Sequence, residues 1–256
     1  MTHDPRNSRK LSQRDVQALT FIGEGYEVAQ YQLHRAVFGG VSAVMVSRFA
    51  RRMREAGYIA VERWNRIGIN RLRLTTQGRD ALAARGIPAE SLFVPRQPVA
   101  TKDLAHTLAI NDLRVMLRKL NFDAVLPAWA LQRRFSPAPP AIPDVLALRK
   151  SNGGRAGAVL ACEVDMGGEK WSKVFLPKLR ALDALLREWC DNERVLIAIL
   201  TRGSRRAAMI TAALDEFSAT TLVRELPSAN GNDQLSALEA EIHEWAAALT
   251  ATVQSN

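Results

Sequence analysis

Residues 143–166 read PDVLALRKSNGGRAGAVLACEVDM, and this stretch decides the architecture of the second half of the chain. Two apolar runs flank the segment SNGG, which is typical of the turn of a β-hairpin. Three carboxylates, Asp144, Glu163 and Asp165, lie at the start of these runs or inside them, where a charge is costly to bury. Each of these carboxylates therefore needs a cation or a charged side chain as a partner.

Strand periodicity predicts that the three carboxylates meet. Glu163 and Asp165 are two residues apart and project from the same face of their strand, where Asp144 of the neighbouring strand can converge with them. Converging carboxylates repel one another unless a hard cation such as Mg²⁺ lies between them. The alternative is that they form ion pairs with basic side chains of the following helix and fix that helix on the sheet. These basic residues are Lys173, Lys178 and Arg180.

The runs around this hairpin predict a mixed sheet flanked by helices. Residues 195–200 are apolar throughout, which is typical of a strand covered on both faces. The final amphipathic helix either covers the sheet or pairs with a second copy of the chain. Strands are expected at about residues 128–135, 144–150, 158–166, 194–200 and 220–226. Helices are expected at about residues 104–120, 172–190, 204–217 and 232–253.

The first half of the chain predicts three helices, a two-stranded ribbon and a further helix. Ser12 is expected to begin the first helix, which Gly23 and Gly25 end. Further helices are expected at residues 27–38 and 42–56 and after Thr75 or Thr76, and strands at 58–64 and 69–75. This order resembles that of the winged helix-turn-helix superfamily. In that superfamily a motif such as MREAGYI closes the third helix, and a motif such as LTTQGRD follows the wing.

The positive charge is concentrated in this first half. The chain has a formal net charge of +9, and residues 1–100 contain sixteen Lys and Arg against eight Asp and Glu, a net +8. This asymmetry is typical of a polyanion-binding module joined to a near-neutral one. The third helix combines an apolar stripe with a basic edge, which is the electrostatic footprint of nucleic-acid binding. The alternatives are a solvated basic face and a winged helix that binds protein.

The resemblance implies the residues that contact double-stranded DNA. An α-helix fits the major groove, and arginine makes bidentate contacts with guanine or phosphate. The third helix would enter the groove through Ser42, Ser47, Arg48, Arg51 and Arg52. The ribbon would contact phosphate or the minor groove through Arg63, Arg66, Arg71 and Arg73. Alternation places the last two on the face opposite Leu72 and Leu74.

Three prolines and the absence of periodicity mark residues 88–101 as a linker. Residues 1–87 would then form the winged helix-turn-helix domain, and residues 102–256 a second α/β domain that ends in the amphipathic helix. No apolar run approaches the roughly 20 residues of a membrane span, so we expect a cytoplasmic protein without membrane contact. The two cysteines, Cys162 and Cys190, lack metal-ligand spacing and are expected to be buried.

The second half resembles the restriction-endonuclease-like fold. That fold places Pro-Asp at the start of its second strand and Glu-x-Lys in its third, and the matching positions here are Pro143-Asp144 and Glu163-Val164-Asp165. Asp165 therefore stands where the fold has lysine. A lysine of the next helix, Lys178 among them, would have to supply the positive charge, and without one strand cleavage is not expected.

Taken together, the motifs LAHTLAINDL, IPDVLAL, CEVDMGGEKW and LPKLRAL resemble those of the replication-relaxation family, over most of residues 10–200. The family pattern is His-x-Leu-x-x-Asn-Asp, then Pro-Asp, then Glu-x-Asp followed by Lys. The matching residues are His106, Leu108, Asn111, Asp112, Pro143, Asp144, Glu163, Asp165 and Lys178. The resemblance implies that His106 faces the carboxylates, and it implies a role in the replication, transfer or regulation of a plasmid or other mobile element.

Two main functions follow from these features. The first is a sequence-specific double-stranded DNA-binding protein, a transcriptional regulator or a replication or transfer accessory factor, that needs no cofactor. Its nuclease-like domain would be degenerate and would serve homodimerisation or the binding of a replication or transfer protein. The second is a Mg²⁺-dependent DNA nuclease or nickase targeted by the winged helix. In it Asp144, Glu163 and Asp165 hold the metal, and Lys178 and His106 complete the catalytic set. A third possibility is an interaction protein that docks through the acidic cluster.

Overall fold

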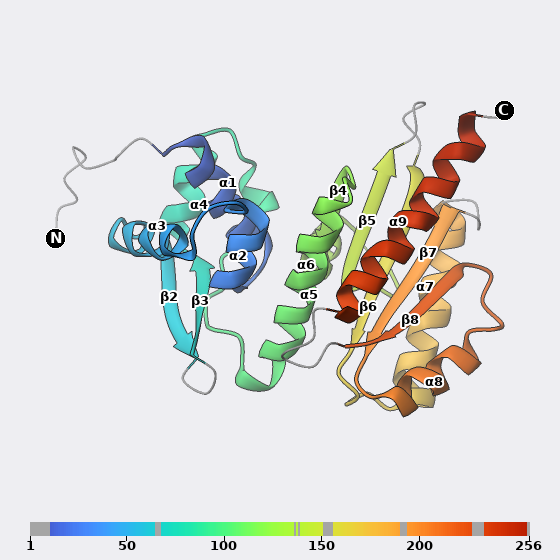
Figure 1. The fold of residues 1–256 in the computed structure, drawn as a ribbon. Coiled ribbons are helices and arrows are strands. Elements are labelled where there is room, and N and C mark those ends of the chain that lie inside the picture. Colours follow the sequence, from blue (N-terminus) through green and yellow to red (C-terminus); the bar gives the residue numbers. More distant parts are fainter. Residues whose placement is uncertain are drawn as a thin grey trace. The chain divides into compact units, whose positions relative to one another are not determined.

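The computed structural model divides the chain into two compact units, Met1–Val115 and Met116–Asn256 (Figure 1). The division falls within the helix α5 (Thr101–Lys119), later than the linker expected at residues 88–101. Among the described residues, no helix combines the length and the apolar character needed to cross a membrane. The structure describes residues 11–64, 68–135, 137, 139–150, 156–189, 194–226 and 233–254.

The first unit contains the elements expected from its sequence, in the expected order, together with a short additional strand. They are α1 (Gln13–Glu24), β1 (Val28–Ala29), α2 (Gln30–Val37), α3 (Ala43–Glu55), β2 (Ile59–Trp64), β3 (Ile69–Leu74), α4 (Thr76–Ala83) and a 3-10 turn at Ala89–Ser91. The three strands form an antiparallel sheet in the order β1-β3-β2. β1 lies within the stretch 27–38 that is expected to be helical, and the helix begins only at Gln30; two residues are too few to show the alternation of a strand.

Side-chain caps begin three of these helices where the sequence predicts them. The hydroxyl of Ser12 accepts the backbone N–H of Asp15, whose carboxylate accepts the N–H of Ser12 in return. The hydroxyl groups of Ser42 and Thr75 cap α3 and α4 by accepting the N–H groups of Val44 and Gly78. Each such cap stabilises its helix by about 1 kcal/mol, because an otherwise unpaired N–H gains a partner.

The predicted linker packs onto the first unit. Leu92 is buried in the same apolar cluster as Phe21, Phe49 and Leu72. The ring of Phe93 stacks on that of Tyr26 with 4.3 Å between centroids. Burial of these side chains makes the segment part of the core of this unit.

The second unit contains a mixed five-stranded sheet in the order β4-β5-β6-β7-β8. β4, β5 and β6 pair antiparallel, whereas β6, β7 and β8 pair parallel. The strands are β4 (Ala124–Pro127), β5 (Val145–Lys150), β6 (Ala156–Asp165), β7 (Val195–Thr201) and β8 (Thr220–Glu225). Every residue of β7 is buried, which confirms a strand covered on both faces.

The strand expected at residues 128–135 is wrong, because this stretch forms the helix α6 (Ala128–Arg134). The actual strand, β4, ends at Pro127, which is also the residue that precedes the helix. Trp129 and Leu131 are two residues apart and fit a strand, but so short an apolar pattern does not exclude a helix, in which Leu131 is buried.

Helices cover the sheet of the second unit. A π-helical turn (Trp171–Phe175) leads into α7 (Leu176–Trp189), which packs with α8 (Ser204–Ala213) on one face. The long helix α9 (Asp233–Gln254) lies across the opposite face, with Leu238 and Ile242 buried (Figure 1). The sequence predicts that this helix either covers the sheet or pairs with a second copy of the chain, and in the structure it covers the sheet.

Candidate nucleic-acid interface and buried carboxylates

The helix α3 presents a basic face to solvent. Val46, Phe49 and Met53 are buried in the core of the first unit, whereas Arg48 and Arg51 are exposed. Within the described residues, the nearest charge partner of Arg51 is Glu55, at the long distance of 4.0 Å, and both side chains are largely exposed. Water therefore weakens this ion pair, and Arg51 stays available to an anion. The face therefore carries an uncompensated positive charge that can attract phosphate.

Other predicted contact residues of α3 have partners inside the first unit. Ser42 caps the helix, and Arg52 forms an ion pair with Asp15 of α1. The hydroxyl of Ser47 accepts a hydrogen bond of 2.6 Å from the side-chain amide of Gln30. Asn70 of β3 donates to the same amide group of Gln30 at 2.9 Å. This chain of hydrogen bonds connects α3 through α2 to the hairpin.

The arginines of the β2–β3 hairpin lie in two different environments. Arg63 is exposed, and Arg66 lies outside the described residues. Arg71 and Arg73 lie on the face opposite Leu72 and Leu74, as alternation predicts, but their side chains are only 13% and 12% exposed.

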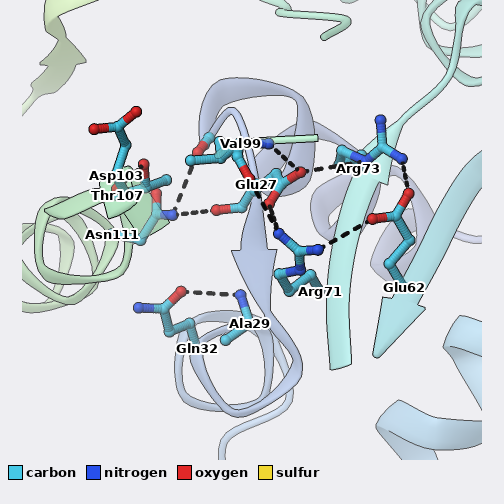
Figure 2. Close-up of polar contacts among 11 residues, drawn as sticks. Glu27, Ala29, Gln32, Glu62, Arg71, Arg73, Val99, Asp103, Thr107 and Asn111 are labelled. Atoms are coloured by element: carbon cyan, nitrogen blue, oxygen red, sulfur yellow. Dashed lines mark hydrogen bonds and ion pairs between the residues drawn. The ribbon is translucent and has the colours of Figure 1, made fainter. Parts of the chain in front are cut away.

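Glu27 is the buried partner of these two arginines (Figure 2). Arg71 lies 3.1 Å from Glu27 and 3.1 Å from Glu62, and Arg73 lies 3.4 Å from Glu27 and also pairs with Glu62. Two arginines and two carboxylates therefore form one network whose charges balance. Such a network has little positive charge left for phosphate, so these arginines contribute less to an anion-binding face than Arg48 and Arg51 do.

Both the side chain and the backbone of Glu27 form hydrogen bonds with other segments. The carboxylate of Glu27 accepts the N–H of Val99 at 2.9 Å. Burial raises the pKa of Glu27 above its usual value. This hydrogen bond and the charges of Arg71 and Arg73 lower it and offset only part of that effect. Asn111 of α5 donates to the carbonyl of Glu27 at 2.5 Å and to that of Gly25 at 3.3 Å (Figure 2). Asn111 therefore stabilises the loop that positions the ion-pair network.

The neighbouring motif residue, Asp112, also has a partner in this unit. Tyr31 donates its hydroxyl hydrogen to Asp112 at 3.0 Å, and Arg35 lies 3.8 Å away. Burial raises the pKa of Asp112. The Asn-Asp pair of the sequence motif thus connects α5 to α2 and to the preceding loop.

In the second unit, Glu163 and Asp165 are 1% and 3% exposed and lie on the face of β6 that α7 and α8 cover. Lys178 of α7 donates to Glu163 at 2.6 Å. Burial, together with the charge of Asp144, raises the pKa of Glu163 to about 8, although Lys178 lowers it. A carboxyl group with this pKa can exchange a proton near neutral pH.

Asp144 directly precedes β5 and lies beside Glu163 and Lys178. Its carboxylate accepts the backbone N–H of Val164 at 2.8 Å. Burial lowers the pKa of Lys178, but the charges of Glu163 and Asp144 outweigh that effect and raise it above its usual range. The structure therefore brings Asp144, Glu163 and Lys178 together.

Asp165 has a different set of partners. Its carboxylate accepts hydrogen bonds from the hydroxyl of Thr201 and from Arg206 of α8, both at 2.7 Å, and from the N–H of Gly167 at 2.9 Å. The guanidinium group of Arg206 lies over the rings of Trp171 and Phe175, at 5.7 and 5.8 Å from their centroids. Asp165 thus connects β6 to α8 and, through Arg206, to the π-helical turn. The alternative of ion pairs with the following helix describes the pair of Glu163 with Lys178, but not Asp165, whose cation comes from α8.

The metal site expected from the sequence requires three converging carboxylates. Within the described ranges, no three side chains of His, Cys, Asp or Glu are grouped so that they can hold a metal ion. Asp144 and Glu163 remain the pair with the donor chemistry for a hard cation. His106 lies in the part of α5 that belongs to the first unit, and its position relative to the carboxylates stays a prediction.

Sequence reasoning missed three residues that shape these sites. Glu27 is a charged residue next to a two-residue strand, so the pattern that would identify it as buried is absent. Thr201 and Arg206 lie 36 and 41 residues from Asp165, a separation at which periodicity carries no information.

A comparison with known protein families shows to which family the chain belongs. A family model described as Replication-relaxation matches residues 10–199, which is more than half of the 256 residues. No curated protein and no solved structure matches the chain.

Proposed function

Since the chain belongs to the replication-relaxation family, we propose that it is a sequence-specific double-stranded DNA-binding protein that acts in the replication, transfer or regulation of a plasmid or other mobile element. In this proposal the first unit is a winged helix-turn-helix domain, α3 is the recognition helix, and the β2–β3 hairpin is the wing. The family description supports a role in replication or relaxation, and the surface of the first unit supports DNA as the ligand.

The observation that carries the proposal is the solvent face of α3. Arg48, Arg51 and Arg54 are exposed on a helix whose opposite side is anchored in the core by Val46 and Phe49. A rigid helix of this kind fits the major groove, and its arginines can pair with phosphates or guanines. The exposed Arg63 of the hairpin adds a phosphate contact beside the groove.

We assign the second unit to self-association or to a replication or transfer partner. A restriction-endonuclease-like sheet that has lost the lysine of its third strand is expected to bind without cutting. Homodimerisation would place two recognition helices on a palindromic site.

The test is selection of bound fragments from plasmid and genomic DNA in the presence of Mg²⁺, with the recovered fragments analysed both for enrichment and for cut ends. We expect a discrete set of enriched, uncut sites with the wild-type protein and their loss with an Arg48→Ala/Arg51→Ala variant. Arg202→Ala, which removes an exposed arginine of the second unit, is the matched control. Recovery of no bound DNA at low salt would refute DNA binding, and recovery of DNA without enrichment of any sites would refute its sequence specificity.

A second candidate is a Mg²⁺-dependent nuclease, and the position of Lys178 favours it. This lysine lies at Glu163, so it offers the positive charge that Asp165 does not. Asp144 and Glu163 would hold the cation. Nicking of supercoiled plasmid that requires Mg²⁺ and disappears in both Asp144→Asn and Lys178→Met variants would establish this activity. Intact plasmid under the same conditions would exclude it.

A further inference from the structure

Resting on the proposed DNA binding, we propose that Val44 and Met45 recognise the C5-methyl groups of thymine in the major groove. These two side chains are 55% and 41% exposed, at the beginning of α3. Two adjacent exposed apolar side chains on a basic helix offer a contact to a partner that carries both negative charge and an apolar group.

The helical geometry places Val44 on the proposed DNA-binding face. Residues four and seven positions apart lie on one side of a helix, and Val44 is four residues before Arg48 and seven before Arg51. All three are exposed, whereas Val46 and Phe49 are buried. Met45 lies on the flank of this face.

The neighbouring polar side chains are already engaged. Ser42 accepts the N–H of Val44, and Ser47 accepts a hydrogen bond from Gln30, which in turn accepts one from Asn70. These bonds hold the start of α3 against α2 and the hairpin. In the first two turns of α3, the exposed side chains without a hydrogen bond or ion pair within the described part of the chain are those of Ala43, Val44, Met45 and Arg48.

Charge decides in favour of DNA over an apolar protein surface as the occupant. Arg48 and Arg51 follow Val44 on the same side of α3, one and two turns along the helix, and burying them against an apolar partner would leave their charges without compensation. In DNA the phosphates flank the groove, and the thymine methyl group is the apolar feature of its floor. N-terminal residues of a recognition helix are the ones that reach base edges.

The experiment uses the full chain and the duplex with the highest affinity from selection on random sequences. Each thymine of that duplex is replaced by deoxyuridine, which removes one methyl group and leaves the hydrogen-bonding pattern unchanged. For the wild-type protein we expect about a fourfold loss of affinity at one or two positions, as the transfer free energy of one methyl group predicts. In Val44→Ala and Met45→Ala variants the loss at the corresponding position should disappear.

Two further variants serve as matched controls. Val174→Ala and Met209→Ala remove exposed apolar side chains from the second unit and should leave the response to deoxyuridine unchanged. Circular dichroism shows whether each variant is folded.

The outcomes separate this inference from the proposed function. A protein that binds its duplex tightly and tolerates every deoxyuridine replacement overturns the inference and leaves DNA binding intact. A protein that binds no duplex at low salt overturns the proposed function itself. Binding of a protein partner that is lost in Val44→Ala, without duplex binding, would assign this face to protein recognition and overturn both.

Discussion

The Nζ atom of Lys178 lies 2.6 Å from Oε2 of Glu163, a carboxyl group that β6 carries in the interior of the second unit. The other oxygen of this group, Oε1, is buried without a hydrogen-bond partner in the described part of the chain. The pair combines a carboxyl group of raised pKa with a lysine that is partly accessible, which makes its contribution to stability dependent on pH.

Glu163→Gln should make the free energy of unfolding less dependent on pH. The folded-state pKa of Glu163 is raised from 4.5 to about 8, so the folded protein holds this proton more tightly than the unfolded chain does. The resulting stabilisation is complete below pH 4.5 and is lost as the pH rises to about 8, at up to about 1.4 kcal/mol per pH unit. Denaturant unfolding at pH 5 and pH 8 measures the difference.

The control for this change is Glu188→Gln, which neutralises an exposed carboxyl group of α7. Equal pH dependence in the wild type and in Glu163→Gln would contradict the raised pKa.

Lys178→Met should destabilise the protein more at pH 9 than at pH 6. Removing the cation leaves Glu163 buried without a charge partner, a loss of roughly 3 kcal/mol when the carboxyl group is ionised. At pH 6 Glu163 can stay protonated, and the loss is smaller. The double variant Lys178→Met/Glu163→Gln should recover most of the stability at pH 9, which thermal unfolding of the four proteins can measure. Additive effects of the two single changes would show that the ion pair is not energetically coupled.

Glu27→Gln should destabilise the first unit by roughly 3–5 kcal/mol, because Arg71 and Arg73 lose their buried counter-charge. Glu62→Gln is the matched comparison and should have a smaller effect, since Glu62 is 36% exposed and water can replace part of its interaction. Thermal unfolding followed by circular dichroism ranks the two variants. A larger loss for Glu62→Gln would reverse the roles assigned to them.

The salt dependence of DNA binding should identify which arginines contact phosphate. Loss of one phosphate contact lowers the slope of log K against log salt by about 0.9. We expect a change of this kind for Arg51→Ala and for Arg63→Ala, whose side chains are exposed. Arg73→Ala should leave the slope nearly unchanged, because its charge is balanced by Glu27 and Glu62. Affinity titrations at several salt concentrations measure these slopes, and a full unit of change for Arg73→Ala would place it in contact with the DNA backbone.

Much of the fold is encoded in local sequence patterns. The apolar stripe of α3 and the hydroxyl caps of Ser12, Ser42 and Thr75 predict helices that the structure contains. The continuous apolar run of β7 predicts a strand buried on both faces. These features depend on residues within a few positions of one another, so one sequence is enough to find them. The prediction is wrong at β1 and α6, where the apolar pattern is too short to distinguish the period of a strand from that of a helix.

The tertiary structure decided the partner of each buried charge. Alternation correctly placed Arg71 and Arg73 opposite the core-facing leucines, yet it carried no sign that Glu27 would neutralise them. The same alternation placed Glu163 and Asp165 on one face, but only the packing of α7 and α8 gave one of them Lys178 and the other Arg206. Periodicity specifies the face from which a side chain projects. The group that meets it there comes from a distant segment, and chain packing alone brings the two together.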